Sequence, residues 1–202
     1  MVTLIILSAV AYLVGAIPTG FLFCKYLFNI DITEQGSGNI GASNVARVLG
    51  KRYFPLIFLL DAAKAWGMLC VAAYVLGANA TGASWQQQLL IASLLLGNAF
   101  SPFLKFKGGK GVATSVGVIA CVFPLHIVAL FMVCWLVLVA WLREPFLASL
   151  GSMTMLLVAL LLMAEFSELI LGSWLLLWLV LRHYGNITSW CKVCCSCPLR
   201  KG

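Results

Sequence analysis

One run of small and hydrogen-bonding residues, 36–47, lies between two apolar stretches and ends in an arginine. Glycines let backbone N–H groups approach a phosphate closely, and serine and asparagine side chains add neutral hydrogen-bonding groups. The arginine supplies a planar charged fork that matches the oxygens of a phosphate. The run therefore predicts an anion-binding site. Its candidate ligand-binding residues are Gly36, Ser37, Gly38, Asn39, Asn44 and Arg47.

Two further segments have similar chemistry. Residues 105–114 place three lysines around glycines at the start of an apolar stretch, where helix N-terminal N–H groups would add positive potential. Residues 182–186 follow the last apolar stretch and combine an arginine, a histidine and an asparagine. Cations at the ends of membrane spans are also common as lipid-headgroup anchors, which is the structural alternative. The candidate site residues in these segments are Lys107, Gly108, Gly109, Lys110, Gly111, Thr114, His183 and Asn186.

Two nucleotide-binding patterns are excluded by their context. Residues 36–41 spell the glycine pattern of a dinucleotide site, but no strand precedes them and no β-α-β unit is expected. Residues 108–110 lack the Ser or Thr and the spacing of a P-loop. The cysteines near the C-terminus have the spacing of half a zinc site without a second half. We therefore expect no cofactor, no metal and no nucleic-acid partner.

The composition places these segments in a membrane protein. Of 202 residues, 63% are hydrophobic and 9% are charged, and the mean hydropathy is +1.06. At roughly 20 apolar residues per span, this length allows about six to eight helices and little else. The expected fold is all-α, a compact bundle of about seven transmembrane helices. We expect one transmembrane domain, residues 1–190, followed by a Cys-rich cytoplasmic tail, residues 191–202.

Charge-free segments and breakers set the span boundaries. Residues 2–24 carry no charge, and Pro124 is the natural break in the long apolar stretch 111–142. A polar patch at 79–88 separates the second span from the third. The expected spans cover residues 2–24, 53–76, 89–104, 111–123, 125–141, 145–164 and 169–181. The last is short by itself and could be extended by tilt or by residues beyond it.

The distribution of cations predicts the orientation in the membrane. With these spans, the loops on one side hold 12 of the 13 Lys and Arg residues. Those loops are residues 25–52, 105–110, 143–144 and 182–202. By the positive-inside rule this side is cytoplasmic and the N-terminus lies outside. The exception is Lys64, three residues after Asp61 within a span, which forms either a structural pair or a functional intramembrane charge.

Taken in order along the chain, these motifs resemble one family closely, the bacterial acyl-phosphate:glycerol-3-phosphate acyltransferases of the PlsY family. The length and the predicted topology are also similar to that family. The matching motifs are Gly-Ser-Gly-Asn-Ile-Gly-Ala-Ser-Asn-Val at 36–45 with Arg47, Asp61-x-x-Lys64, Phe-Lys-Gly-Gly-Lys-Gly-Val-Ala-Thr at 106–114, and Arg182-His183-x-x-Asn186-Ile187.

The resemblance implies an activity and its partners. A fatty acyl group would pass from acyl phosphate to the 1-hydroxyl of sn-glycerol 3-phosphate, forming lysophosphatidic acid and phosphate, the first step of phospholipid synthesis. The protein would be a multi-pass protein of the bacterial inner membrane, with its active site on the cytoplasmic face. Its partners would be both substrates, the lipid bilayer, and functionally the phosphotransacylase that forms acyl phosphate.

The resemblance also implies roles for individual residues. The family is thought to use no protein nucleophile: the phosphate of the activated donor takes the proton, while the protein supplies orientation and charge stabilisation. General-base catalysis by the histidine is the alternative mechanism. The implied catalytic set is Ser37, Arg47, Lys110, His183 and Asn186, with Asn98 and Ser149 as further substrate-binding positions.

The chain departs from the family pattern at a few positions, and other functions compete. Asn98 stands where the family usually has histidine, Ala65 where it has glycine, and Ser189 where it has arginine. A transporter or channel for a phosphorylated solute, or a structural membrane subunit, would also fit the composition. Transporter sites tend to lie at the midplane, whereas the polar groups here gather at one membrane face, which favours an enzyme.

Overall fold

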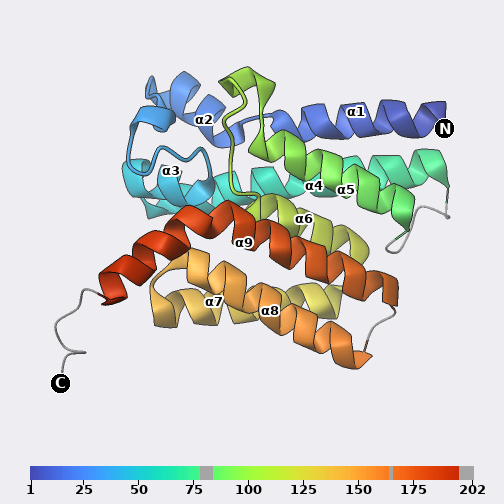
Figure 1. Ribbon diagram of the computed structural model, residues 1–202. Helices are drawn as coiled ribbons and strands as arrows, with labels where there is room; N and C mark the ends of the chain where they lie inside the picture. Colours follow the sequence, from blue (N-terminus) through green and yellow to red (C-terminus); the bar gives the residue numbers. More distant parts are fainter. Residues whose placement is uncertain (78–83, 164–165, 196–202) are drawn as a thin grey trace.

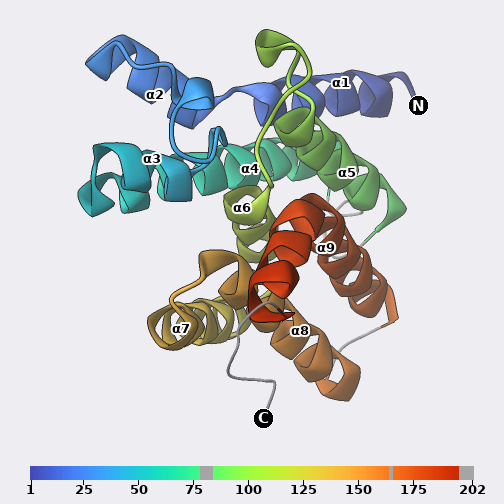
Figure 2. The ribbon, with the colours of Figure 1, turned by 60° about the vertical axis from the view of Figure 1, so that its left-hand side comes forward.

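The computed structural model describes residues 1–77, 84–163 and 166–195 (Figure 1). Within these residues the chain is helical and forms no β-strand, apart from one antiparallel bridge between Ser101 and Lys107. Figures 1 and 2 show two groups of helices, α1 to α5 and α7 to α9, with α6 between them. The predicted all-α bundle is confirmed.

The first predicted span, 2–24, is a broken helix. It consists of α1 (Val2–Ala16) and the first part of α2 (Thr19–Phe28), and these helices are bent by 43°. Pro18 lacks a backbone N–H and disfavours helical backbone in the residue before it, so α1 ends there. The chain then leaves α2 through Asn29, which has left-handed backbone, and enters the loop that carries the first candidate segment.

The first candidate segment forms a loop and a short helix. The elements here are the 3-10 turn η1 (Ile32–Glu34), helix α3 (Ala42–Leu49) and the 3-10 turn η2 (Lys51–Tyr53). The side chain of Asp31 accepts a hydrogen bond from the backbone of Thr33 at 2.9 Å and caps η1. Ile40 and Val45 are buried in the core, so the segment is anchored to the bundle.

The next part of the bundle pairs α1 with α5 and α4 with α6. A Cβ at Gly15 would clash with the carbonyl of Leu94, and one at Gly97 with the carbonyl of Tyr12. The backbones of α1 and α5 therefore touch, as small residues allow in membrane bundles. The elements are α4 (Phe54–Leu76), α5 (Trp85–Ala99), the 3-10 turn η4 (Pro102–Leu104) and α6 (Val112–Val122).

Helix α5 begins and ends earlier than predicted. It starts inside the predicted polar loop 79–88, because Ser84 caps it by accepting a hydrogen bond from the backbone of Gln87. It ends at Ala99 rather than near residue 104, since a proline at position 102 excludes helical backbone just before it.

The last part of the bundle packs α7 against α8 and α8 against α9. These helices are α7 (Leu125–Leu142), α8 (Pro145–Met163) and α9 (Phe166–Cys195). Pro124 separates α6 from α7, as predicted. The last predicted span, 169–181, is extended by residues beyond it, since α9 runs for 30 residues. Residues 182–186 therefore lie on a helix and not in a loop, since Gly185 is the one weak breaker there and the next proline is Pro198.

Helix lengths show which segments can cross a membrane singly. Among the described residues, α4 with its preceding turn, α7, α8 and α9 are long and apolar enough, and α1 with α2 makes a bent fifth span. Helix α6 has 11 residues, about 16 Å, and is too short to cross alone. Its residues Thr114 to Ile119 are consecutively buried, so α6 is enclosed by other helices.

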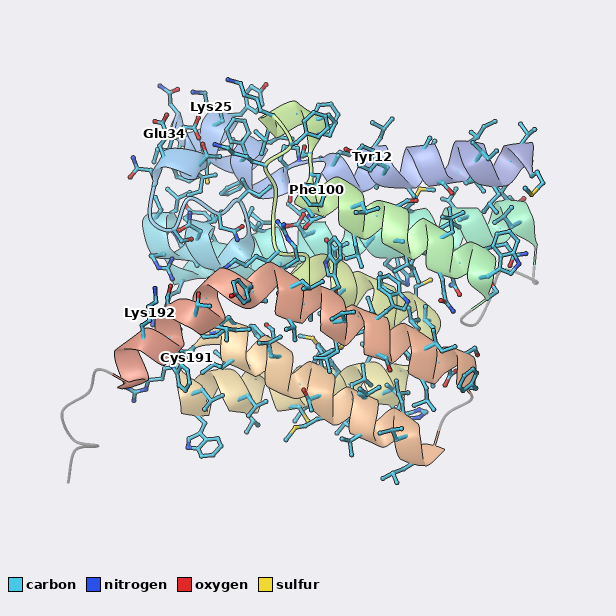
Figure 3. The ribbon with its side chains drawn as sticks, viewed as in Figure 1. Tyr12, Lys25, Glu34, Phe100, Cys191 and Lys192 are labelled. Atoms are coloured by element: carbon cyan, nitrogen blue, oxygen red, sulfur yellow. The ribbon has the colours of Figure 1, made fainter. Side chains whose placement is uncertain are left out.

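The candidate segments gather at one end of the bundle. In Figure 3, the labelled Lys25, Glu34 and Lys192 lie at the end opposite to the start of α1, and α3 lies at that same end. The orientation of this end toward the cytoplasm stays a prediction. Helix α9 continues past residue 190, the predicted domain boundary, and residues 196–202 of the predicted tail lie outside the described residues.

Candidate active site

A pocket lies where the three candidate segments meet, between α3, the start of α6 and the α7 to α9 group. Its volume is about 170 Å³. The polar residues that line it are Ser37, Asn39, Ser43, Asn44, Arg47, Lys110, Glu144, Ser149, His183 and Asn186. The larger apolar side chains are Phe54, Phe58, Val112, Trp135, Pro145 and Phe146.

Three helices begin at this pocket. Helix α3 starts at Ala42, α6 at Val112 and α8 at Pro145, and each of these residues lines the pocket. The first N–H groups of a helix have no partner within the helix, and this end carries partial positive charge. Convergent helix starts therefore favour an anion here before any charged side chain is considered.

Asn44 organises the first candidate segment. Its buried side chain accepts a hydrogen bond from the backbone N–H of Ser37 at 2.8 Å and donates to the carbonyl of Gln35 at 2.9 Å. A second, longer contact joins its amide to the carbonyl of Ile32 at 3.4 Å. Gly36 has φ +59°, and a Cβ there would clash with the amide of Asn44. The loop is thus wrapped around one asparagine, which fixes where Ser37 meets the pocket.

Two cations reach the pocket from different elements. The guanidinium of Arg47, on α3, lies 3.5 Å from Oδ1 of Asn44. Lys110, before α6, donates from Nζ to Oδ1 of Asn186 on α9 at 2.6 Å. Burial lowers the pKa of Lys110, and the charges of Arg182 and Arg47 lower it further. A bound anion would relieve this repulsion, so the pocket favours a phosphate.

The glycine-rich loop 108–111 is fixed from two sides. The N–H of Gly109 donates to the carbonyl of Asn98 at 2.8 Å, and Arg182 donates to the carbonyl of Gly109 at 2.8 Å. A Cβ at Gly108 would clash with the same Asn98 carbonyl. Gly111 has φ +82°, in the left-handed region that favours glycine. These contacts set the position of Lys110, which lies between Gly109 and Gly111.

His183 and Ser149 differ in how much of their hydrogen-bonding capacity is used. His183 is buried beside the ring of Phe146, with centroids 6.1 Å apart, and neither ring nitrogen has a partner among the described residues. The hydroxyl of Ser149 accepts from Trp135 Nε1 at 3.1 Å and donates to the carbonyl of Pro145 at 2.8 Å. The histidine is therefore free to bond a ligand, whereas the serine can only accept one further hydrogen bond.

The structure divides the predicted site residues into two groups. Those that line the pocket are Ser37, Asn39, Asn44, Arg47, Lys110, Gly111, Ser149, His183 and Asn186. Those that do not are Gly36, Gly38, Asn98, Lys107, Gly108, Gly109 and Thr114. The glycines and the Asn98 carbonyl shape the backbone beside the pocket, Lys107 is exposed at its bridge to Ser101, and Thr114 is buried within α6. Membership of a motif therefore does not separate residues that face the pocket from residues that support it.

An aromatic cluster at the pocket was missed from the sequence. The rings of Phe54, Phe58 and Trp135 pack on one another with centroids 5.5 to 5.8 Å apart. In an apolar span such rings look the same as lipid-facing residues, so no signal singled them out. Arg182 was also left out of the site, although it adjoins His183 in the last motif. Its contact with Gly109 now joins α9 to the glycine-rich loop.

The chain is similar to known proteins over almost its whole length. The family model described as glycerol-3-phosphate acyltransferase matches residues 5–192. A glycerol-3-phosphate acyltransferase of Carboxydothermus hydrogenoformans is 40% identical over 191 residues, which is 91% of each chain. One from Listeria welshimeri is 35% identical over 195 residues, covering 93% of this chain and 92% of the relative.

A solved structure is also similar over most of the chain. It is the crystal structure of PlsY, an integral membrane glycerol 3-phosphate acyltransferase, in its glycerol 3-phosphate form. The TM-score is 0.83 and the identity 32%, with coverage of 94% of this chain and 92% of that chain. Its lysophosphatidic acid form gives a TM-score of 0.81. The chain described here belongs to the PlsY family of glycerol-3-phosphate acyltransferases, which are integral membrane proteins.

Proposed function

We propose that this protein transfers a fatty acyl group from acyl phosphate to the 1-hydroxyl of sn-glycerol 3-phosphate, releasing lysophosphatidic acid and inorganic phosphate. The observation that carries the proposal is the composition of the pocket. Two cations, Arg47 and Lys110, and the starts of α3, α6 and α8 line the same pocket as a group of aromatic rings. A site of this kind suits two phosphate groups and the beginning of an acyl chain.

The reaction needs no protein nucleophile. The 1-hydroxyl oxygen attacks the acyl carbonyl carbon, the bond from that carbon to the phosphate oxygen breaks, and the departing phosphate takes the hydroxyl proton. The donor is already activated as a mixed anhydride, so the protein has to align the groups and stabilise negative charge. Among the described residues that line the pocket, none pairs a Ser or Cys nucleophile with a base, and the Ser149 hydroxyl is bonded to the carbonyl of Pro145.

The proposed role of each pocket residue follows from the hydrogen bonds that its side chain can still form. Arg47 and Lys110 would hold phosphate oxygens, with Ser37 adding a hydroxyl at the entrance. Ser149 can accept but not donate, so it would receive the proton of a glycerol hydroxyl and not contact a phosphate. Asn186, already bonded to Lys110, would fix the direction of the lysine.

The location of the protein follows from the same proposal. The basic end of the bundle would face the cytoplasm of a bacterial cell, in the inner membrane, by the positive-inside rule. Glycerol 3-phosphate would enter from water and the acyl donor from the bilayer side. The phosphotransacylase that makes acyl phosphate would then be the functional partner, because it supplies the donor.

The donor is tested with purified protein in lipid nanodiscs. Glycerol 3-phosphate is offered with acyl phosphate or with acyl-CoA of the same chain length, and lysophosphatidic acid and phosphate are scored. We expect one phosphate per lysophosphatidic acid from acyl phosphate and no product from acyl-CoA. Product from acyl-CoA alone, or folded protein inactive with acyl phosphate, would reject the proposal.

A further inference from the structure

The break between α1 and α2 lies inside an apolar stretch, where unpaired backbone carbonyls are costly. Side chains from elsewhere in the chain bond the carbonyls at this break. The hydroxyl of Ser101 donates to the carbonyl of Ala16 at 2.7 Å, and Nζ of Lys64 donates to the carbonyl of Ile17 at 2.7 Å. A similar bond from Tyr12 to the carbonyl of Phe100, at 2.6 Å, joins the neighbouring ends of α1 and α5 (Figure 3). Side-chain hydrogen bonds from other parts of the chain therefore stabilise the break.

One ion pair holds both sides of the break. Nζ of Lys64 lies 2.7 Å from Oδ1 of Asp61, and their side chains are 9% and 11% exposed. The same carboxylate oxygen accepts a hydrogen bond from the hydroxyl of Thr19 at 2.5 Å. Ile17 is the last residue before Pro18 and Thr19 is the first after it. Each member of the pair thus bonds a different side of the proline.

These cross-helix bonds distinguish the pair from an ordinary surface ion pair. Oppositely charged residues three apart on an exposed helix contribute little. Removing both charges from water is expensive, so a buried ion pair by itself adds little to stability. Here both charges make their further hydrogen bonds to the break, and none of those bonds serves α4 itself. The geometry of the break is therefore what the pair stabilises.

The break is connected to the pocket through backbone packing. Gly20, next to Thr19, packs so closely on the carbonyl of Ile40 that a Cβ would clash there. The residues on each side of Ile40, Asn39 and Gly41, line the pocket. On α4, Phe58 precedes the ion pair by one turn and also lines the pocket. A shift of α2 relative to α4 would thus move one side of the pocket against the other.

We infer that Asp61 and Lys64 are positioning residues, which hold the broken first span so that the 36–41 backbone keeps its place at the pocket. The inference rests on the proposed function for its activity readout only. It also accounts for Lys64 as the one cation outside the predicted cytoplasmic loops, because its charge is neutralised and used where it lies.

Two sets of variants test this inference. Thr19→Val removes one hydroxyl and keeps the shape, and Thr19→Ser restores the hydroxyl. The double exchange Asp61→Lys with Lys64→Asp keeps an ion pair on α4 but would turn a carboxylate toward the Ile17 carbonyl and an ammonium toward the Thr19 hydroxyl. The control is Thr154→Val on α8, where an exposed hydroxyl bonds only the carbonyl of Leu150.

Turnover is measured well below the unfolding temperature of each variant, together with amide hydrogen exchange of residues 29–41. We expect Thr19→Val and the double exchange to lower kcat about tenfold and to speed exchange in this segment, while Thr19→Ser and Thr154→Val match the parent. Full activity and unchanged exchange in Thr19→Val, or recovery in the double exchange, would overturn the inference. If the parent transfers no acyl group, the proposed function fails, and the hydrogen exchange still tests the ion pair.

Discussion

The two sides of the pocket are built differently. The N-terminal wall, residues 37–47 with Lys110, consists of a loop, a short helix and a glycine-rich turn held by hydrogen bonds to Asn44 and Asn98. The C-terminal wall, formed by Trp135, Phe146, Ser149, His183 and Asn186, stands on the long helices α7, α8 and α9. One wall is shaped by polar contacts and the other by helix packing.

The difference shows how polar groups are divided between structure and chemistry. The backbone groups of a loop need hydrogen-bond partners outside regular helix or strand bonding. The Asn44 side chain therefore bonds the N–H of Ser37 and the carbonyl of Gln35. A helix has its backbone bonds already, so His183 can be buried with both ring nitrogens unbonded in the described structure. Substitutions on the two walls should therefore have different signatures: stability with activity on one, activity alone on the other.

The largest effect is expected at the residue that joins the walls. Lys110→Met removes the charge and the bond to Asn186, so kcat/KM for glycerol 3-phosphate should fall about 100- to 1,000-fold. Steady-state kinetics in nanodiscs measure this change. Lys192→Met is the control, because that lysine is exposed further along α9, and it should stay within about twofold. An equal loss of activity in Lys110→Met and Lys192→Met would contradict the claim that Lys110 joins the two walls and binds substrate.

Asn44 and Asn186 compare the walls directly. Asn44→Ala leaves the Ser37 N–H and the Gln35 carbonyl without their partner, so unfolding free energy should fall by about 1 to 3 kcal/mol and activity should fall about tenfold or more. Asn186→Ala should lower activity with little change in stability. Thermal unfolding and turnover are measured on the same preparations. The proposed difference between the two walls is wrong if Asn186→Ala destabilises the protein as much as Asn44→Ala does.

Substitution of His183 tests whether its unbonded ring acts as a general base or only forms hydrogen bonds. If the departing phosphate takes the proton, His183→Gln should keep the shape of the pH profile of kcat and lose about tenfold in rate, because glutamine still forms hydrogen bonds. If the histidine is the general base, the acidic limb of the profile disappears and the loss is about 100-fold or more. Rates from pH 5 to 10 separate these outcomes, and near-full activity rejects the general base.

A smaller effect is expected from the protonation of Lys110. Its pKa is lowered by burial and by two neighbouring cations, so its charge is lost as pH rises through that lowered value, and binding of the anion weakens on the alkaline side. KM for glycerol 3-phosphate should therefore rise with pH. In Lys110→Arg the guanidinium stays charged, and this rise should disappear even if turnover falls a few-fold. The same alkaline rise in both variants would assign it to another group.

Much of the fold and the grouping of the site could be predicted from the sequence. Apolar stretches gave most helices, and the positions of cations placed residues 36–47, 105–114 and 182–186 at one end, where the structure brings them together. The order of the motifs along the chain could not show which of their residues line the pocket. Asn44 resembles a ligand-binding residue by type, yet its side-chain bonds support backbone, and Asn98 supports the glycine-rich loop through its main-chain carbonyl. These distinctions require three-dimensional contacts.

Other features could not be predicted for physical reasons. At the break beside Pro18 the proline itself is visible in the sequence, but the side chains that bond the carbonyls there, those of Ser101 and Lys64, lie far along the chain and could not be assigned to it. The end of α9 could not be located from hydropathy, because the residues after 181 are largely polar while no strong helix breaker stops the helix before Pro198. The aromatic cluster with Trp135 had no signal, because aromatic residues are expected throughout apolar spans.

The turnover of Arg47→Ala tests the central claim most directly, that the pocket between the two walls binds substrate phosphate. Arg47 lines the pocket, whereas Arg52, five residues further, lies on η2 with its guanidinium over the ring of Tyr53. With acyl phosphate and glycerol 3-phosphate, we predict at least about a 100-fold loss of phosphate release in Arg47→Ala. Arg52→Ala should stay within about twofold of the parent. Near-normal release by folded Arg47→Ala would contradict the account and assign the arginine to anchoring.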